Sequence, residues 1–291
     1  MPDRIVRVER LMGTVIGVDI RDVARPAGAK PALDRFFESL HDIDRRFSPW
    51  RADSDISRIA DGRLSETEAG GDVRFVLAAC DHLAAASAGA FDARGHRPDG
   101  RLDPSGFVKG WSVEEAAWHL TDAGLCDFSI NAGGDVLAYG RPEPGHQDGR
   151  GWRVGIRNPD RGDAIAAVLE VRDLAVATSG LYERGDHVRD PRTSMAPDTH
   201  RSLTVVGPSL AWADAYATAG LVMGHDALGW VASHPGYGAL AISPAGELLW
   251  TEVVEPLLVQ PARGSETRRE VPFDSPKFSR NSQPPGLTWT P

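Results

Sequence analysis

The segment GDHVRDPRTSMAP, residues 185–197, concentrates side chains that can do chemistry. It holds one histidine, two aspartates and two arginines but almost no large apolar side chain, which is not typical of a protein core. A histidine near its ordinary pKa is the usual general base, and His187 has Asp190 and Arg192 close by in sequence. Asp190 either orients the imidazole or begins the Asp-Pro turn. The local sequence leaves His187 open as a catalytic base or as a polar loop residue.

Asp214 and Thr218 form a second candidate, because the segment ADAYAT, residues 213–218, lies in a predicted helix. Residues four apart lie on the same face of a helix, so the carboxylate and the hydroxyl can reach one cation. Together with a main-chain carbonyl from elsewhere they suit Mg²⁺, which takes few protein ligands and keeps positions for phosphate oxygens. The alternative is an ordinary helix in which the threonine bonds to its own backbone.

Lys109 is the third candidate. The segment DPSGFVKGWSVEE, residues 103–115, predicts a flexible loop that runs into a helix beginning at Ser112, where Ser112 and Glu115 match a capping box. Free amides at a helix N-terminus attract phosphate, and Lys109 adds a full charge. Only three of the 32 basic residues are lysines, which favours a specific role here, although a solvated surface lysine is the alternative.

Gly133 and Gly134 form the fourth candidate, in the segment SINAGGDVLAYG, residues 129–140. Two glycines between predicted strands let a backbone or a ligand approach closely. A plain hairpin turn accounts for them equally well.

Periodic apolar patterns distribute these candidates over helices and strands. Residues 31–47, 73–88, 112–123, 211–223 and 225–233 predict helices, and residues 128–131, 135–139, 152–157, 164–171, 174–178, 202–206, 238–243 and 247–253 predict strands. Residues 5–20 predict paired strands or one bulged strand. Because helices and strands do not alternate regularly, we expect an α+β fold with largely antiparallel sheets. Residues 1–258 are expected to form the folded domain, and the polar, Pro-rich residues 259–291 a flexible C-terminal tail.

The charge balance excludes several classes of protein. The chain has 32 basic and 41 acidic residues and a net charge of −9, whereas nucleic acids and anionic membranes need clustered cations. The N-terminus offers no apolar stretch of signal-peptide length, and no later window resembles a membrane span. The sequence therefore predicts a cytoplasmic protein with no membrane segment of its own. Cys80 and Cys126 are expected to be plain buried thiols without a metal or redox role.

The four candidates together resemble the ApbE family, the FAD:protein FMN transferases or flavin transferases. The matching segments, in order, are MGT (12–14), FSPWRADSDISRI (47–59), GAFD (89–92), LDPSGFVKGWSVEEA (102–116), NAGGD (131–135), WRVGIRNP (152–159), ATSGLYER (177–184), HVRDPRT (187–193) and ADAYATA (213–219). No single motif is decisive, but nine in the same order make chance a poor explanation.

The resemblance implies a two-lobed α+β fold that binds a flavin nucleotide in its cleft. It implies Mg²⁺-dependent transfer of the FMN half of FAD to a Ser or Thr hydroxyl of a target protein, with release of AMP. Residues at the family's flavin-nucleotide positions are Met12, Trp50, Ala90, Phe91, Asp92, Lys109, Glu115 and Val188. The metal positions are Asp214, Thr218 and the backbone carbonyl of Ser112, and His187 matches the histidine credited as general base.

Three positions depart from the family pattern. Ser194 stands where the family usually has glycine after DPRT, Arg189 replaces a usual aliphatic residue, and Ala217 replaces a small polar residue. None of these changes removes a metal ligand or the base. The departures at Ser194 and Arg189 keep open a flavin-binding module without turnover. A further alternative is an FAD pyrophosphatase, in which water replaces the protein hydroxyl and the products are FMN and AMP.

Overall fold

The computed structural model describes residues 4–21, 26–95, 97, 99–143, 149–181, 189–193, 195–261 and 268–270. The strands form two sheets. The larger has nine strands in the order β1 (Ile5–Leu11), β2 (Thr14–Ile20), β3 (Phe128–Ala132), β4 (Asp135–Tyr139), β7 (Leu174–Gly180), β8 (Ser202–Gly207), β9 (Gly238–Ile242), β10 (Leu248–Trp250) and β12 (Arg268–Glu270). The smaller has the order β11 (Leu258–Pro261), β6 (Ile165–Val171) and β5 (Trp152–Arg157). All neighbouring strands are antiparallel except β10 and β12, so the fold is α+β, as predicted.

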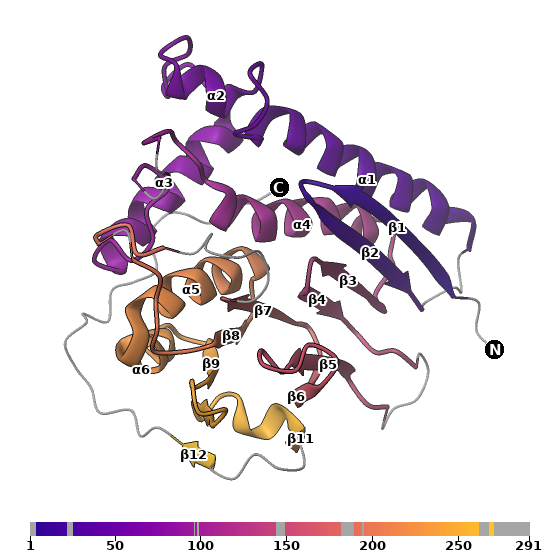
Figure 1. Ribbon diagram of the computed structural model, residues 1–291. Coiled ribbons are helices and arrows are strands. Elements are labelled where there is room, and N and C mark those ends of the chain that lie inside the picture. Colours follow the sequence, from indigo (N-terminus) through magenta and orange to yellow (C-terminus); the bar gives the residue numbers. More distant parts are fainter. Residues whose placement is uncertain are drawn as a thin grey trace.

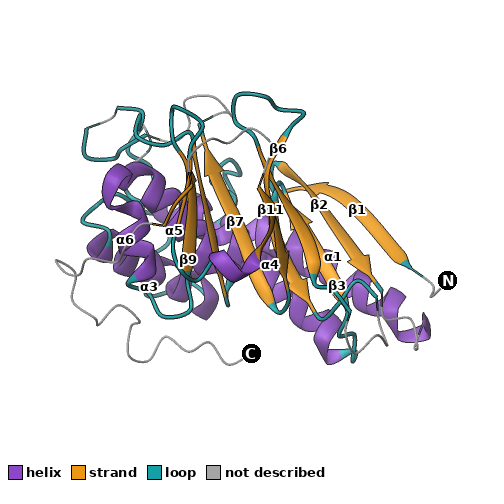
Figure 2. Ribbon diagram, turned by 90° about the horizontal axis from the view of Figure 1, so that it is seen from below, coloured by secondary structure: helices purple, strands orange, loops and turns teal. Residues whose placement is uncertain are grey.

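Helices cover one face of the large sheet. They are α1 (Pro26–Phe47), α2 (Asp55–Ala60), α3 (Gly71–Ala86), α4 (Ser105–Asp122), α5 (Leu210–Met223) and α6 (Ala227–Ala232). Figure 1 shows α1 and α4 running side by side, with α5 next to α4 and against β7 and β8. Figure 2 shows the helices gathered on one side of the strands. The main apolar core lies between these helices and the sheet and includes Phe36, Phe107 and Phe128.

The small sheet covers part of the opposite face, where a second apolar core forms. Val136 and Ala138 of β4 point into this second core, whereas Leu137 between them points to the helices. This alternation follows from the two-residue period of a strand, and it places Asp135 on the helical side with Leu137. β4 therefore carries side chains that serve both cores.

The β1–β2 hairpin closes through a two-residue turn at Met12 and Gly13, whose φ angles are 53° and 71°. Two positive φ values are typical of a type I′ turn, which matches the twist of the flanking strands. A non-glycine residue in this region costs about 1–2 kcal/mol. Met12 adopts this conformation although glycine would do so at a lower energy cost.

The main difference from prediction is the start of α4. We expected a loop with a helix beginning at Ser112, but the helix begins at Ser105, and Ser112 is fully buried in its middle. Asp103 accepts hydrogen bonds from the Ser105 amide and hydroxyl, at 3.0 and 2.5 Å, and so favours a helix start about two turns earlier. The predicted capping box of Ser112 and Glu115 is therefore wrong. Ser112 instead donates its hydroxyl to the Lys109 carbonyl oxygen at 2.9 Å.

Other elements differ less, and of the two cysteines expected to be buried, Cys80 is buried but Cys126 is exposed. Strands β4 and β5 have the predicted bounds, and α2 was not predicted because six residues are too few to show a helical period. Past residue 258 the chain continues in strand pairing, through β11 to Pro261 and in β12. Among the described residues, no helix combines the length and hydropathy of a membrane span.

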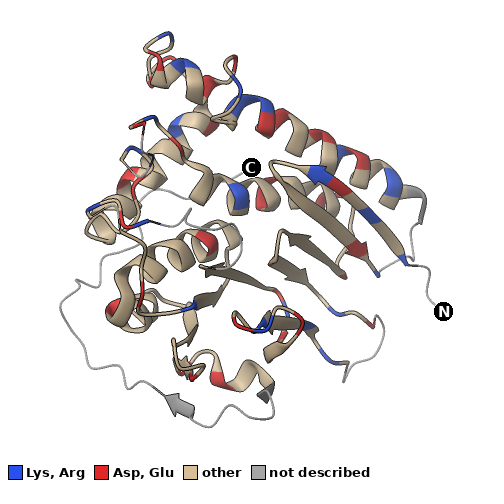
Figure 3. Cartoon of the chain, in the orientation of Figure 1, with Lys and Arg blue, Asp and Glu red and all other residues tan. Residues whose placement is uncertain are grey.

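Charged residues of both signs alternate along α1 and the β1–β2 hairpin (Figure 3). Arg4 pairs with Asp19 at 3.0 Å, and Arg7 pairs with Asp34 at 2.6 Å. Arginines of this region are thus paired with carboxylates nearby.

Candidate active site

Lys109, Asp135 and Asp214 meet on the helical side of the large sheet. The Lys109 ammonium lies 2.6 Å from Asp135 Oδ2 and 3.4 Å from Asp214 Oδ1. Asp135 and Asp214 are both buried, while about a third of the lysine side chain, 30%, stays exposed. The three residues come from α4, β4 and α5, so only the folded chain brings them together. Asp135 was not singled out from the sequence, although it follows the predicted glycine pair directly.

The charges of this cluster favour the binding of a further cation. Burial alone would lower the pKa of Lys109, but the carboxylates of Asp135 and Asp214 outweigh burial and hold that pKa above its ordinary value. Burial, together with the neighbouring charge of Asp135, raises the pKa of Asp214 even though Lys109 opposes the shift. One ammonium thus compensates two buried carboxylates, which leaves the cluster with a net negative charge when both are ionised.

The donor set fits a small hard cation. Asp214 Oδ2 is buried and has no hydrogen-bond partner among the described residues. Thr218, one turn further along α5, has its hydroxyl oxygen 3.2 Å from the Ser179 hydroxyl on β7. The described residues hold no group of three or more His, Cys, Asp or Glu side chains that could bind a metal by themselves. Mg²⁺ binds proteins through one or two carboxylates and takes its other ligands from water and phosphate. The unpartnered Asp214 Oδ2 fits such a site.

Met12 and Ser112 lie beside Lys109. The Ser112 hydroxyl is 3.5 Å from the Met12 sulfur, and its other contact is the Lys109 carbonyl oxygen. Figure 1 shows the tip of the β1–β2 hairpin next to α4. The strained turn at Met12 therefore presses against the helix that carries Lys109, and strain of this kind collects at functional sites.

The glycine pair forms the neighbouring hairpin turn between β3 and β4. Gly133 and Gly134 have φ values of 65° and 106°, and a Cβ atom on Gly133 would overlap the Thr14 hydroxyl. Both predicted explanations hold at once, because the glycines make a tight turn and also let it approach the β1–β2 hairpin closely.

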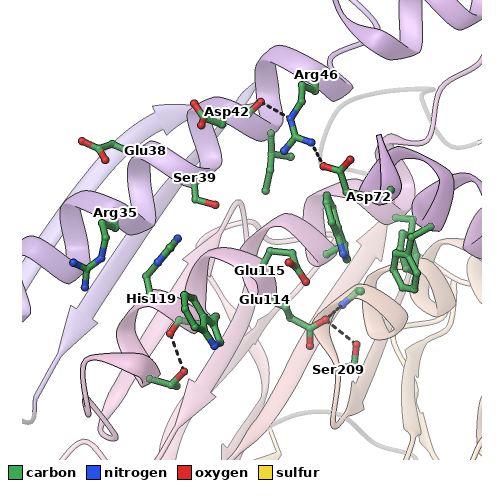
Figure 4. Close-up of a pocket in the computed structure, with 18 of the residues that line it drawn as sticks. Arg35, Glu38, Ser39, Asp42, Arg46, Asp72, Glu114, Glu115, His119 and Ser209 are labelled. Carbon is green, nitrogen blue, oxygen red and sulfur yellow. Dashed lines mark hydrogen bonds and ion pairs between the residues drawn. The ribbon is translucent and has the colours of Figure 1, made fainter. Parts of the chain in front are cut away.

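Glu114 holds α5 in place and was missed by sequence reasoning. Its carboxylate accepts hydrogen bonds from the amides of Leu210 and Ala211, at 2.8 and 3.1 Å, and from the Ser209 hydroxyl at 2.9 Å (Figure 4). It therefore caps the N-terminus of the helix that carries Asp214 and Thr218. Burial raises the pKa of Glu114, although the three hydrogen bonds oppose the shift. No local pattern marks it, because its partners lie almost a hundred residues away.

Ala90, Phe91 and Asp92 follow α3 and lie against the start of α4. Ala90 and Phe91 are buried, and a Cβ on Gly106 would meet the Phe91 ring at 3.0 Å. Asp92 accepts a hydrogen bond from the Arg94 amide at 2.7 Å. Thr218 is also close to Gly106. The segment at 90–92 and the face of α5 that carries Thr218 are therefore neighbours.

Trp50 lies on the surface. Its side chain is 80% exposed, and the Arg97 guanidinium lies 4.5 Å from the centre of its ring. Trp50 is therefore not a core residue, which was the alternative to a ligand-binding role. An exposed indole beside a cation is available to stack on a planar ring system.

Comparison with known proteins decides the family. The sequence model of the ApbE family matches residues 12–95 and 93–241, which together make up most of the chain. The chain belongs to the ApbE family.

Relatives named FAD:protein FMN transferase match the chain at moderate identity. The protein from Rhodobacter capsulatus is 34% identical over 167 residues, which cover 54% of this chain and 31% of the relative. The protein from Treponema pallidum is 33% identical over 159 residues, which cover 50% of this chain and 44% of the relative. The chain thus spans less than half the length of these curated relatives.

Solved ApbE structures share the fold over nearly the whole chain. A structure titled flavin transferase ApbE from Vibrio cholerae has a TM-score of 0.75 at 23% identity and covers 88% of this chain and 99% of its own. An ApbE protein from Thermotoga maritima has a TM-score of 0.74 at 22% identity and covers 89% and 100%. The chain therefore shares its fold with both structures.

The ApbE positions His187 and Val188, and the departure at Ser194, lie outside the described residues. The part of the loop that is described forms a turn. The Asp190 carboxylate accepts hydrogen bonds from the Arg192 amide at 2.9 Å and from its guanidinium at 2.8 Å. The Arg192 side chain in turn lies against Gly89. Asp190 is therefore tied up in the turn, and the turn adjoins the segment at 90–92.

Glu115 is the ApbE position that lies apart from the cluster. It lines a hollow of about 1100 Å³ between α1, α4 and the start of α5, together with Asp42, Trp118 and His119 (Figure 4). Lys109 lies on a different face of α4. The described structure therefore groups Met12, Lys109, Ser112, Asp214 and Thr218 in one site and Ala90, Phe91 and Asp92 beside it, but does not bring Glu115 to them.

Proposed function

We propose that this chain is a Mg²⁺-dependent FAD:protein FMN transferase that moves FMN from FAD to a Ser or Thr hydroxyl of a target protein. The observation that carries the proposal is the buried cluster of Lys109, Asp135 and Asp214, with its orphan carboxylate oxygen. It occurs in a chain whose relatives bear the name FAD:protein FMN transferase.

Asp214, Thr218 and the Ser112 carbonyl would hold the metal. Mg²⁺ bound there would neutralise phosphate oxygens and stabilise the charge that develops on the leaving group. Lys109 has a tight contact with Asp135 and a looser one with Asp214, so it can turn one donor to a phosphate oxygen while Asp135 keeps its position. Met12, Trp50 and the residues Ala90 to Asp92 would line the nucleotide.

The reaction replaces the phosphoanhydride bond of FAD with a phosphoester bond to the acceptor hydroxyl. The acceptor hydroxyl oxygen bonds to the phosphorus of the FMN half, and the bond from that phosphorus to the bridging oxygen breaks. AMP leaves with the electron pair of that bond. We assign the hydroxyl proton to His187 on its motif alone, since general base catalysis of this kind contributes about 10² to 10⁴ in rate.

The first prediction concerns the metal site. The wild-type chain, FAD, Mg²⁺ and a flavin-accepting protein domain should give a domain heavier by one FMN residue, together with AMP. Asp214→Asn should lower this rate by at least about a hundredfold, because it removes a charged ligand at the reacting phosphate. Intact-protein mass spectrometry and chromatography of AMP measure both products.

Asp122→Asn, an exposed change at the end of α4, is the matched control and should leave the rate unchanged. Full Mg²⁺-dependent transfer by Asp214→Asn would refute the metal assignment. Free FMN and AMP without a modified domain would instead identify a pyrophosphatase, and FAD binding without either product a flavin-binding module.

A further inference from the structure

A second hollow lies on the other face of the large sheet, opposite the helices. It has a volume of about 300 Å³, and its lining includes Ser129 and Asn131 of β3, Val136 of β4, and Arg153 and Arg157 of β5. On β3, Ile130 belongs to the helix-side core, so its neighbours Ser129 and Asn131 point away from the helices. On β4, Leu137 belongs to the same core, so its neighbour Val136 also points away from the helices. We call this hollow the outer groove.

The outer groove ends at a notch in the sheet. β3 and β4 stop at the Gly133–Gly134 turn. On one side the turn packs against β2, where the Gly133 amide donates a hydrogen bond to the Val15 carbonyl oxygen at 3.0 Å. On the other side β7 pairs with β4 only up to Val176, and its last four residues, 177–180, pair with β8 alone. The notch is therefore the step beside the turn where β7 continues past the end of β4.

The notch joins the outer groove to the Lys109 cluster. Gly134 and Thr178 line the groove, and the Thr178 amide donates to Asp135 Oδ1 at 2.9 Å. The other oxygen of the same carboxylate contacts Lys109 at 2.6 Å. Only the end of β4, at Asp135, thus separates the outer groove from the Lys109 cluster.

The wall of the groove is a strand with an open edge. β5 is the outer strand of the small sheet and pairs only with β6 among the described residues. The backbone groups on its other edge can pair with an incoming extended segment, a common mode of peptide binding. Arg153 and Arg157 are exposed on β5. The Arg153 guanidinium makes a long ion pair with Glu170, in which Nε lies 3.8 Å from Oε2. This edge therefore favours an acidic segment.

We propose that the outer groove is where the acceptor protein docks, as an extended acidic segment along β5 that carries its hydroxyl through the notch to the cluster. The inference rests on the proposed transferase function and adds the acceptor's route. Phosphoryl transfer places the attacking and leaving oxygens roughly in line. The nucleotide residues Trp50 and Ala90 to Asp92 lie on the helical side, so an acceptor that enters from the other face attacks from the opposite side.

The test uses two variants that change the groove and not the cluster. Ser129→Tyr fills the floor of the groove, and Arg157→Glu reverses the charge of its wall. The matched controls are Val8→Tyr, which adds a tyrosine at a 58% exposed site on β1, and Arg172→Glu, which reverses an exposed charge at the turn before β7. None of the four is a residue of the proposed nucleotide or metal site.

The first readout is binding, which does not depend on turnover. A labelled extended peptide with aspartates on both sides of one threonine is titrated with each full-length protein, and the same peptide with lysines for aspartates is the charge control. Both groove variants should weaken binding of the acidic peptide about tenfold or more, because a reversed charge at a contact is strongly unfavourable. The controls should bind like wild type, and the lysine peptide should bind more weakly. Equal binding by all five proteins, or no binding of the acidic peptide to wild type, would overturn the groove assignment.

The second readout separates the groove from the reaction. FAD affinity should be unchanged in both groove variants, whereas FMN transfer to an acceptor domain should need about tenfold more acceptor. A wild-type protein that binds the acidic peptide in the groove but transfers no FMN would refute the transferase proposal and leave the groove standing. Normal transfer by both groove variants at limiting acceptor would overturn the groove.

Discussion

At the scale of single residues, the two aspartates of the site, Asp135 and Asp214, differ in their contacts. Asp135 is fixed on both sides, by the Thr178 amide at 2.9 Å and by Lys109 at 2.6 Å. Asp214 has the longer contact to Lys109 and a backbone hydrogen bond with Gly110, and its Oδ2 atom is buried without a hydrogen-bond partner among the described residues. Asp135 thus positions the lysine, while Asp214 has capacity left for a cation.

Trp50 gives the second prediction, because its exposure separates binding from stability. Trp50→Ala should weaken FAD binding by about 1–2 kcal/mol through lost stacking and should leave the free energy of unfolding nearly unchanged. Quenching of flavin fluorescence measures the first, and thermal unfolding without ligand the second. The control is Trp118→Ala, another partly exposed tryptophan, 44% exposed and on the far part of α4. Unchanged FAD affinity in Trp50→Ala would remove this residue from the nucleotide site.

At the scale of elements, the site depends on how α4 crosses α5. Gly110 lies where the two helices touch, and a Cβ there would overlap the Leu210 carbonyl oxygen. Glu114, one turn later, caps the amides of α5. These two contacts fix the position of α5 along α4, and therefore the positions of Asp214 and Thr218 relative to Lys109.

The third prediction tests the close crossing. Gly110→Ala should destabilise the fold by about 1–3 kcal/mol, because the methyl group forces two packed backbones apart. Gly229→Ala in α6 is the matched control, since no atom lies within 4 Å of its Cβ position, and it should stabilise by about 0.5–1 kcal/mol. Urea unfolding of both variants measures the difference. Equal stability of the two would show that the crossing has room that the structure does not indicate.

The fourth prediction concerns the cap of α5. Glu114→Ala leaves two buried amides without an acceptor and should lower the unfolding free energy by about 1–3 kcal/mol. The Mg²⁺ dependence of the reaction should shift to higher concentration, because α5 carries Asp214 and Thr218. Glu114→Gln keeps one acceptor oxygen and should recover part of both losses. A normal Mg²⁺ dependence in a destabilised Glu114→Ala protein would limit Glu114 to a structural role.

At the scale of the whole molecule, one sheet serves two cores and separates two openings. The helical face carries the Lys109 cluster and the proposed nucleotide residues, and the other face carries the small sheet and the outer groove. The helical core also encloses titratable groups away from the site. His200 and His234 are buried, and each has one ring nitrogen without a partner among the described residues.

The fifth prediction is a loss of stability in acid. Burial lowers the pKa of His200 and of His234, so the folded chain binds fewer protons than the unfolded chain once the pH falls below the ordinary histidine pKa of about 6.5. Stability should therefore be full above that pH and decrease below it. Thermal midpoints from pH 7.5 to 5.5 measure the slope.

The control for this slope is substitution of the histidine. His234→Gln can still donate to the Trp230 carbonyl oxygen, which His234 Nδ1 contacts at 2.8 Å, but it does not titrate. The variant should flatten the decrease below pH 6.5, whereas His41→Gln, at an exposed site, should not. An unchanged slope in His234→Gln would mean that this histidine does not contribute to the acid sensitivity.

The sequence by itself determined much of this protein. Periodicity predicted most strands to within a residue or two, because alternation depends only on which face of a strand is buried. The spacing of Asp214 and Thr218 placed both oxygens on one helix face, since that follows from 3.6 residues per turn. The family followed from the order of short motifs. These are local properties that a chain carries wherever it folds.

Only the tertiary structure decided what surrounds those residues. Asp135 becomes the partner of Lys109, and Glu114 the cap of α5, through contacts between segments far apart in the chain. The start of α4 was mispredicted because Ser112 matches a capping pattern locally but is buried among other helices, while Asp103 supplies the cap. The notch exists because β7 continues past the end of β4. Register and helix crossing are properties of packed elements, so no reading of one segment at a time contains them.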